Sequence, residues 1–138
     1  MTESNAPNAP SPRADRWGRY LVLVQGSYFL LTGVWPVAHL GSFLAVTGPK
    51  TDLWLVQAFG LLVAAVGAAL LSLPAADRTK AAAFRFGFAT AAMLAFIDVW
   101  FVTRGAIPPV YLLDAVPETA IALAWLIVKR ASRPNPRV

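Results

Sequence analysis

Residues 53–73 read LWLVQAFGLLVAAVGAALLSL, an apolar stretch that contains no charged side chain. A helix of about 20 such residues spans the ~30 Å hydrocarbon core of a bilayer. Inside that core the backbone N–H and C=O groups must bond to one another, which a helix achieves within a single segment. Residues 53–73 therefore predict a transmembrane helix.

Three further apolar segments have a similar length: residues 20–37, 81–102 and 110–128. The first follows basic residues, as in a signal peptide. Its apolar run exceeds the usual ~7–15 residues and no A-x-A-like cleavage site follows it, so we interpret it as a retained span. Because the connecting segments are short, neighbouring helices are expected to be antiparallel. The predicted fold is all-α: a four-helix transmembrane bundle, up-down-up-down, with both termini in the cytoplasm (N-in/C-in).

The composition supports a single membrane domain. Hydrophobic residues make up 57% of the chain and charged residues 14%, against about 25% charged in typical soluble domains. Cysteine is absent, which excludes disulfides, thiol catalysis and iron–sulfur clusters. The net charge of +5 is carried by residues that flank the apolar segments, so anionic lipid headgroups are the expected partner and nucleic acid is not.

The predicted transmembrane domain covers residues 17–130 and has a polar tail on each side. Residues 1–16 and 131–138 carry too little apolar surface to offset the entropy of ordering, so both are interpreted as disordered cytoplasmic tails. Within the connection 38–52, apolar residues are expected to form a short helix at the membrane interface that ends at Gly48-Pro49.

The basic side chains predict the orientation. Cytoplasmic ends of spans are enriched in Lys and Arg, and a cytoplasmic N-terminus puts ten basic residues inside and two outside. The inner set is Arg13, Arg16, Arg19, Arg78, Lys80, Arg85, Lys129, Arg130, Arg133 and Arg137, and the outer set is Lys50 and Arg104. The sequence therefore predicts a multi-pass protein of the cell's inner (plasma) membrane.

Small residues on one face of the segment 53–73 predict a close contact with another helix. Small side chains let two helix backbones approach each other within the membrane, and an amide on the same face can bond across the contact. The residues of this face are Gln57, Gly60, Ala64, Gly67 and Ala68.

Acidic residues of the third and fourth spans are the main candidates for function. Asp98 lies near the outer end of the third span, and Asp114 and Glu118 are four residues apart, hence on one face of the fourth. The three carboxylates are expected to converge in the outer half of the bundle. A carboxylate at mid-membrane costs roughly 2.5–3.5 kcal/mol, so these side chains should face protein or water, be paired, or be protonated. The predicted ligand-binding set is Asp98, Arg104, Tyr111, Asp114 and Glu118, with His39, Lys50 and Gln57 as secondary candidates.

Three interpretations of this set stay open. The favoured one is non-enzymatic binding of a small hydrophobic molecule, a lipid or a partner membrane protein, with homo-oligomerisation undecided. A structural one pairs Asp98 with Arg104 or Lys50, and makes Asp114 the cap of a helix that restarts at Pro117, which lacks an N–H. An enzymatic one uses the carboxylates as acid and base on a lipid-like substrate, in the manner of an isomerase.

Recognisable catalytic and metal-binding motifs are missing from the sequence. Zinc sites normally use several His or Cys ligands, whereas this chain has one His and no Cys. A metal site would have to consist mostly of carboxylates. The chain contains no G-x-S-x-G, H-E-x-x-H or G-x-G-x-x-G pattern. The sequence thus predicts no cofactor, no metal site and no catalytic residue.

Three short stretches together resemble one group of proteins: Phe43–Asp52, IDVWFVTRG at 97–105 and YLLDA at 111–115. They resemble small uncharacterised bacterial membrane proteins with four spans, and the likeness runs from about Arg19 to Lys129. The layout is similar to that of the DoxX-like small membrane proteins, and a bundle with inward carboxylates is similar to the EXPERA sterol-isomerase and sterol-binding fold. The resemblance implies a four-span bundle and carries over no site residue, because no motif of either family matches.

Overall fold

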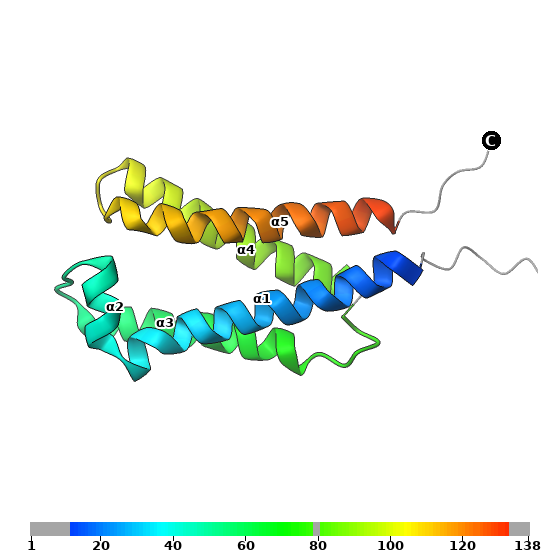
Figure 1. The fold of residues 1–138 in the computed structure, drawn as a ribbon, viewed down its shortest axis with the longest axis horizontal. Helices are drawn as coiled ribbons and strands as arrows, with labels where there is room; N and C mark the ends of the chain where they lie inside the picture. The colour runs from blue at the N-terminus through cyan, green and yellow to red at the C-terminus, as the bar shows by residue number, and fades with distance from the viewer. Residues whose placement is uncertain (1–11, 79–80, 133–138) are drawn as a thin grey trace, which may run out of the picture.

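The computed structural model describes residues 12–78 and 81–132, and this part of the chain is helical with no strand (Figure 1). Its elements are α1 (Pro12–Ala38), α2 (Leu40–Thr47), α3 (Leu53–Ser72), α4 (Ala81–Thr103), the short 3-10 helix η1 (Pro109–Tyr111) and α5 (Leu112–Ala131). Within the described residues, α1, α3, α4 and the η1–α5 segment are each long and apolar enough to cross a membrane. The predicted all-α fold class and its four spans are confirmed.

The first and last long helices, α1 and α5, extend further than the sequence predicted. Helix α1 begins at Pro12 and α5 continues to Ala131, so residues 12–16, which we assigned to a disordered tail, are helical. Proline is well accepted at the start of a helix because its missing N–H has no intrahelical partner there. The remaining tail residues, 1–11 and 133–138, lie outside the described part of the chain, and their disorder stays a prediction.

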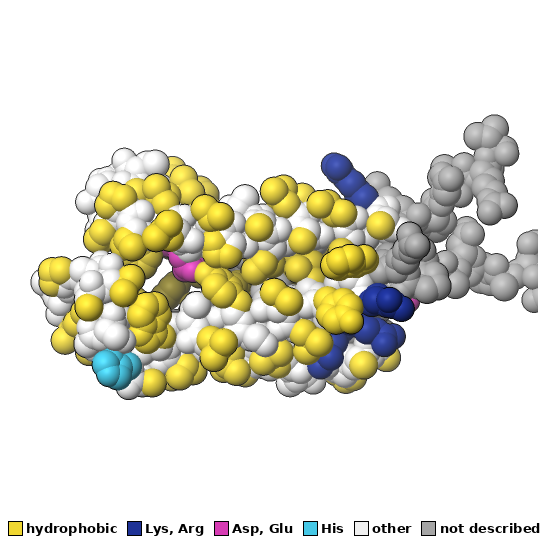
Figure 2. Space-filling view, in the orientation of Figure 1, with side chains coloured by type: hydrophobic (Ala, Val, Ile, Leu, Met, Phe, Trp, Pro, Cys, Tyr) yellow, Lys and Arg dark blue, Asp and Glu magenta, His cyan; other side chains and the backbone are white. Residues whose placement is uncertain are grey.

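The surface of the long helices is apolar. Large side chains such as Leu31, Trp54, Leu62, Leu113 and Ile127 are exposed, and Figure 2 shows hydrophobic side chains along most of the visible face. Lysine and arginine gather at one end of the bundle, where α1 begins and α5 ends (Figures 1 and 2). The charge pattern predicts this end to be cytoplasmic. We call the opposite end, which carries α2 and η1, the α2 end.

The long helices associate as two pairs. Helix α1 packs most extensively against α3, and α4 against α5, whereas the contacts of α1 with α5 and α4 are smaller (Figure 1). In the first pair the backbones nearly touch: a Cβ added to Gly33 would lie 2.4 Å from the backbone nitrogen of Ala64, and one on Gly67 would lie 2.5 Å from that of Leu30. The predicted small-residue face of α3 is therefore its contact with α1. Of that face, Gly60, Ala64 and Gly67 are buried, whereas Gln57 is half-buried and Ala68 is exposed.

The connection between α1 and α3 contains the short helix that the sequence predicted. Helix α2 begins after His39, whose side-chain nitrogen accepts a hydrogen bond from the backbone N–H of Ser42, and it ends at Gly48. Gly48 has a φ of +83°, a left-handed conformation that glycine adopts at little cost because it has no Cβ. The prediction that this helix ends at Gly48-Pro49 is confirmed.

Helix α5 runs without interruption through Pro117, which corrects the expectation that a new helix starts there. The proline removes only the hydrogen bond that the carbonyl of Leu113, in the first turn, would have accepted, and spanning helices tolerate such a loss. Asp114 therefore lies in the first turn of one continuous helix, where the helix dipole favours a negative charge. The unbroken helix also keeps Asp114 and Glu118 on one face.

Candidate functional site

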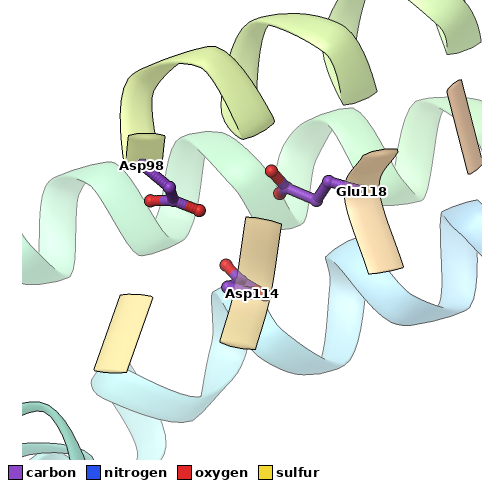
Figure 3. Close-up of side chains that lie close together, drawn as sticks. All are labelled: Asp98, Asp114 and Glu118. Carbon is purple, nitrogen blue, oxygen red and sulfur yellow. The ribbon is translucent and has the colours of Figure 1, made fainter. Parts of the chain in front are cut away.

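Three carboxylates meet between the helix pairs, towards the α2 end. Asp98 comes from α4, and Asp114 and Glu118 come from successive turns of α5. In Figure 3 the three side chains point toward one another. One oxygen from each can be chosen so that all three lie within 4.8 Å of one another. We call Asp98, Asp114 and Glu118 the carboxylate triad. The structure thus brings together the three acidic members of the predicted set.

Two members of the triad are buried without a hydrogen-bond partner. Asp98 is 8% exposed and Glu118 is 2% exposed, whereas Asp114 is half-buried. Oδ2 of Asp98 and Oε2 of Glu118 are buried oxygens that accept no hydrogen bond within the described residues. A buried polar group left in this state costs about 1–3 kcal/mol, and more when it is charged. Such oxygens are rare in folded proteins and require an explanation.

Tyr28 of α1 forms a hydrogen bond with the third member of the triad, Asp114. Its hydroxyl donates a hydrogen bond to Oδ1 of Asp114, and this bond joins the α1–α3 pair to the α4–α5 pair. Sequence reasoning missed Tyr28. The available signal was its place in the middle of the first span, three residues after Gln25 and therefore on the same helix face. Two polar side chains on one face of an apolar helix indicate a polar contact with another helix.

Gln25 is the centre of a second buried polar group, which we call the Gln25 network. Its amide nitrogen donates to the backbone oxygen of Gly87 at 2.8 Å and to Oγ1 of Thr90 at 3.1 Å. Its amide oxygen accepts from Nε1 of Trp125 at 2.7 Å. Gln25 is completely buried and Trp125 is 2% exposed. All the bonds of this network join helices α1, α4 and α5, and its buried polar atoms are paired.

The predicted cationic partners of the triad lie elsewhere. The guanidinium carbon of Arg104 is 4.1 Å from the ring centroid of Trp100. The amine of Lys50 donates to the carbonyl of Thr47 at 2.7 Å and lies 5.3 Å from the ring centroid of Tyr111. Desolvation by burial lowers the pKa of Lys50. Among the side chains that the structure describes, no lysine or arginine forms an ion pair with a triad carboxylate.

The remaining candidates differ in their relation to the triad. Tyr111 is half-buried in η1 at the α2 end, where Lys50 lies over its ring, and it is near enough to Asp98 and Asp114 to interact with them electrostatically. His39 is exposed, and its ring caps α2. Gln57 is half-buried on α3. The structure therefore brings together Asp98, Asp114 and Glu118 and adds Tyr28. It keeps Tyr111 near two of these carboxylates, whereas Arg104, His39 and Lys50 contact other residues. Gln57 lies on α3, which contributes no member of the triad.

An opening leads toward the triad. Figure 2 shows the molecule hollowed between the two helix pairs near the α2 end, with an acidic side chain at the edge of the hollow. Helix α2 lies at this end of the molecule (Figure 1).

The carboxylate oxygens of the triad determine the chemistry of this site. When ionised, they accept hydrogen bonds and act as hard metal ligands. A covalent step at the triad would have to use one of its carboxylates as the nucleophile. No protein-family model, curated protein or solved structure matches this chain. The predicted resemblance to small four-span membrane proteins stays a prediction, and the site has to be interpreted from its own geometry.

Proposed function

We propose that this protein is a binding protein of the plasma membrane that holds a small cationic ligand between its two helix pairs. In this proposal the basic end faces the cytoplasm and the triad lies in the outer half of the bilayer. The ten-to-two distribution of basic residues supports that orientation. The bilayer is the protein's solvent, and the ligand enters through the hollow at the α2 end.

The observation that carries the proposal is the pair of buried oxygens on Asp98 and Glu118 that accept no hydrogen bond. Ionisable groups inside a membrane almost always face a partner or a water-filled cavity. Lysine and arginine of the described chain supply none here. A ligand with positive charge or N–H donors would satisfy these oxygens and offset the repulsion among three carboxylates.

A purely structural role for the triad has less support. The two helix pairs are already joined by the Gln25 network, whose bonds are complete. The triad adds the Tyr28–Asp114 bond to this contact, yet it leaves two oxygens unpaired. A group selected only to fix helix packing would use paired residues, as the Gln25 network does. An acid–base enzyme would need the same site to bind its substrate first.

The test is native mass spectrometry and extraction of bound small molecules from protein purified in mild detergent. We expect a cationic species at about one per chain in the wild type, and its loss in Asp98→Asn and in Glu118→Gln. Asp52→Asn is the matched control, because Asp52 is exposed at the start of α3 and asparagine serves equally well at a helix N-terminus.

Three outcomes would contradict or redirect the proposal. A wild type that carries no species above bulk lipid would refute it. If both triad variants retain the species, it binds at a different site. A bound species that the wild type converts, while Glu118→Gln binds it without conversion, would show that the enzymatic interpretation is correct.

A further inference from the structure

We propose that the ligand of the carboxylate triad is a hard divalent metal ion, coordinated by Asp98, Asp114 and Glu118. The inference rests on the proposed binding function and narrows its ligand from any small cation to one class. It also reverses the expectation from composition, which predicted no metal site because the chain has one His and no Cys. A site made only of oxygen ligands needs neither residue.

The spacing of the ligand atoms fits one ion. Calcium–oxygen bonds are about 2.3–2.6 Å long, so two oxygens on opposite sides of one calcium are at most roughly 4.6–5.2 Å apart. The chosen oxygens of the triad all lie within 4.8 Å of one another. This limit is close to the span of one ion, so a small adjustment of the side chains would let a single ion bond to all three, with water in its other positions. Manganese has the same preference for carboxylate and water oxygens.

The unpaired oxygens are independent support for a ligand at this point. Asp98 and Glu118 are more than nine-tenths buried, and each has an oxygen with no partner in the described chain. Figure 3 shows both side chains directed into the space that they share with Asp114. A divalent ion would satisfy both oxygens and neutralise two of the three carboxylate charges. A single ammonium group would neutralise only one.

Tyr28 provides the outer support that metal ligands commonly have. Ligating carboxylates are usually hydrogen-bonded by neighbouring groups, which fix their orientation. Asp114 is the least buried member of the triad, and the Tyr28 hydroxyl donates to its Oδ1. We therefore assign Tyr28 as a positioning residue that acts through Asp114 and leaves the other oxygen of that carboxylate available to the ion.

The experiment is a titration of the full-length, chelator-stripped protein in detergent with Mn²⁺, in which electron paramagnetic resonance measures the free ion. We expect about one Mn²⁺ to bind per chain, with displacement by Ca²⁺ or Mg²⁺. Asp98→Asn and Glu118→Gln should abolish this binding. Tyr28→Phe, which keeps all three carboxylates, should weaken it by roughly 10–100-fold. Asp52→Asn should bind Mn²⁺ as the wild type does.

Circular dichroism and the thermal midpoint show whether each variant is folded. Should Asp98→Asn or Glu118→Gln not fold, the wild-type stoichiometry and the loss of affinity in Tyr28→Phe decide the question. Folded wild type that binds no Mn²⁺, Ca²⁺ or Mg²⁺, or folded triad variants that bind Mn²⁺ normally, would overturn the metal assignment.

The proposed function has a separate outcome. If metal binding is absent but native mass spectrometry finds an ammonium-bearing molecule that Glu118→Gln loses, the metal assignment fails and the binding function stands. If neither a metal nor an organic cation is found, both fail.

Discussion

The Gln25 network and the carboxylate triad are two buried polar groups in the same contact between helix pairs, and they differ in one respect. Glu118 and Trp125 are seven residues apart on α5, about 10 Å along the helix at 1.5 Å per residue. Every buried polar atom of the Gln25 network has a partner, whereas the triad has two oxygens without one. Residues of the first group join helices α1, α4 and α5, whereas we propose that those of the second bind a partner from outside the chain.

The comparison matters because both groups would look alike in a sequence. Each consists of polar residues within apolar spans. In lipid, a complete network contributes modestly, on average about 0.6 kcal/mol per hydrogen bond. An incomplete one is a cost to the folded protein. Substitutions in the two groups should therefore change stability in opposite directions, and this difference can be measured.

The largest effect is expected from Trp125→Ala. The ring is packed on Gly87, where an added Cβ would lie 2.6 Å from it, and its N–H pairs with Gln25. We expect a loss of about 3 kcal/mol in the free energy of unfolding. This is the lower part of the range for buried aromatic residues, because lipid, not water, surrounds the unfolded spans. Denaturant titration in detergent measures it. Trp17→Ala, at a residue that is 65% exposed, is the control, and equal losses in the two variants would refute the role of the network.

Gln25→Leu should come next. Leucine fills a similar volume but leaves the indole N–H of Trp125 buried and unpaired, so we expect a loss of about 1–2 kcal/mol. Gln57→Leu, on half-buried α3 surface outside the network, should change the same unfolding titration by no more than about 0.5 kcal/mol. An unchanged stability in Gln25→Leu would mean that the helix pairs do not depend on the network.

Glu118→Gln is expected to raise the stability of the ligand-free protein, whereas the two substitutions in the Gln25 network lower it. The amide cannot ionise and can donate to the remaining carboxylates, so in the absence of ligand we expect a gain of about 1 kcal/mol. The thermal midpoint of stripped protein measures the change, with Asp52→Asn as the matched loss of an exposed charge. Saturating ligand should reverse the order, because it stabilises only the wild type. If Glu118→Gln is less stable than the wild type, the triad has a structural role like that of the Gln25 network.

The smallest effect is expected from Arg104→Gln. Its guanidinium lies over the ring of Trp100, a contact worth about 0.5–1 kcal/mol at an exposed site. Because this contact does not involve Asp98, ligand affinity at the triad should be unchanged in the same Mn²⁺ titration. A change in affinity larger than about threefold would favour the ion pair between Asp98 and Arg104 that the sequence suggested.

Part of the site could be predicted because helix periodicity fixes it. Asp114 and Glu118 had to share a face of one helix, and the short turn before α5 brought Asp98 of the preceding span near them. The expected partners could not be predicted in the same way. Arg104 follows the last residue of α4, and its long side chain can take several directions. In the structure it lies over the ring of Trp100, four residues earlier in the last turn of α4. Tyr28 lies 86 residues before Asp114, and only the docking of the two pairs brings them together.

The sequence by itself determined the fold class, because four apolar segments of bilayer length can satisfy their backbones in lipid only as helices. It also determined where the small residues lie, and hence which face of α3 allows a close contact. Tertiary structure alone decided which polar groups are complete. Hydrogen-bond partners of Gln25 come from α4 and α5. Among the residues that the structure describes, none donates to Oδ2 of Asp98 or Oε2 of Glu118, and this depends on every side chain that surrounds them. Whether a buried polar group has a hydrogen-bond partner depends on its three-dimensional surroundings, and a local pattern of residues cannot predict it.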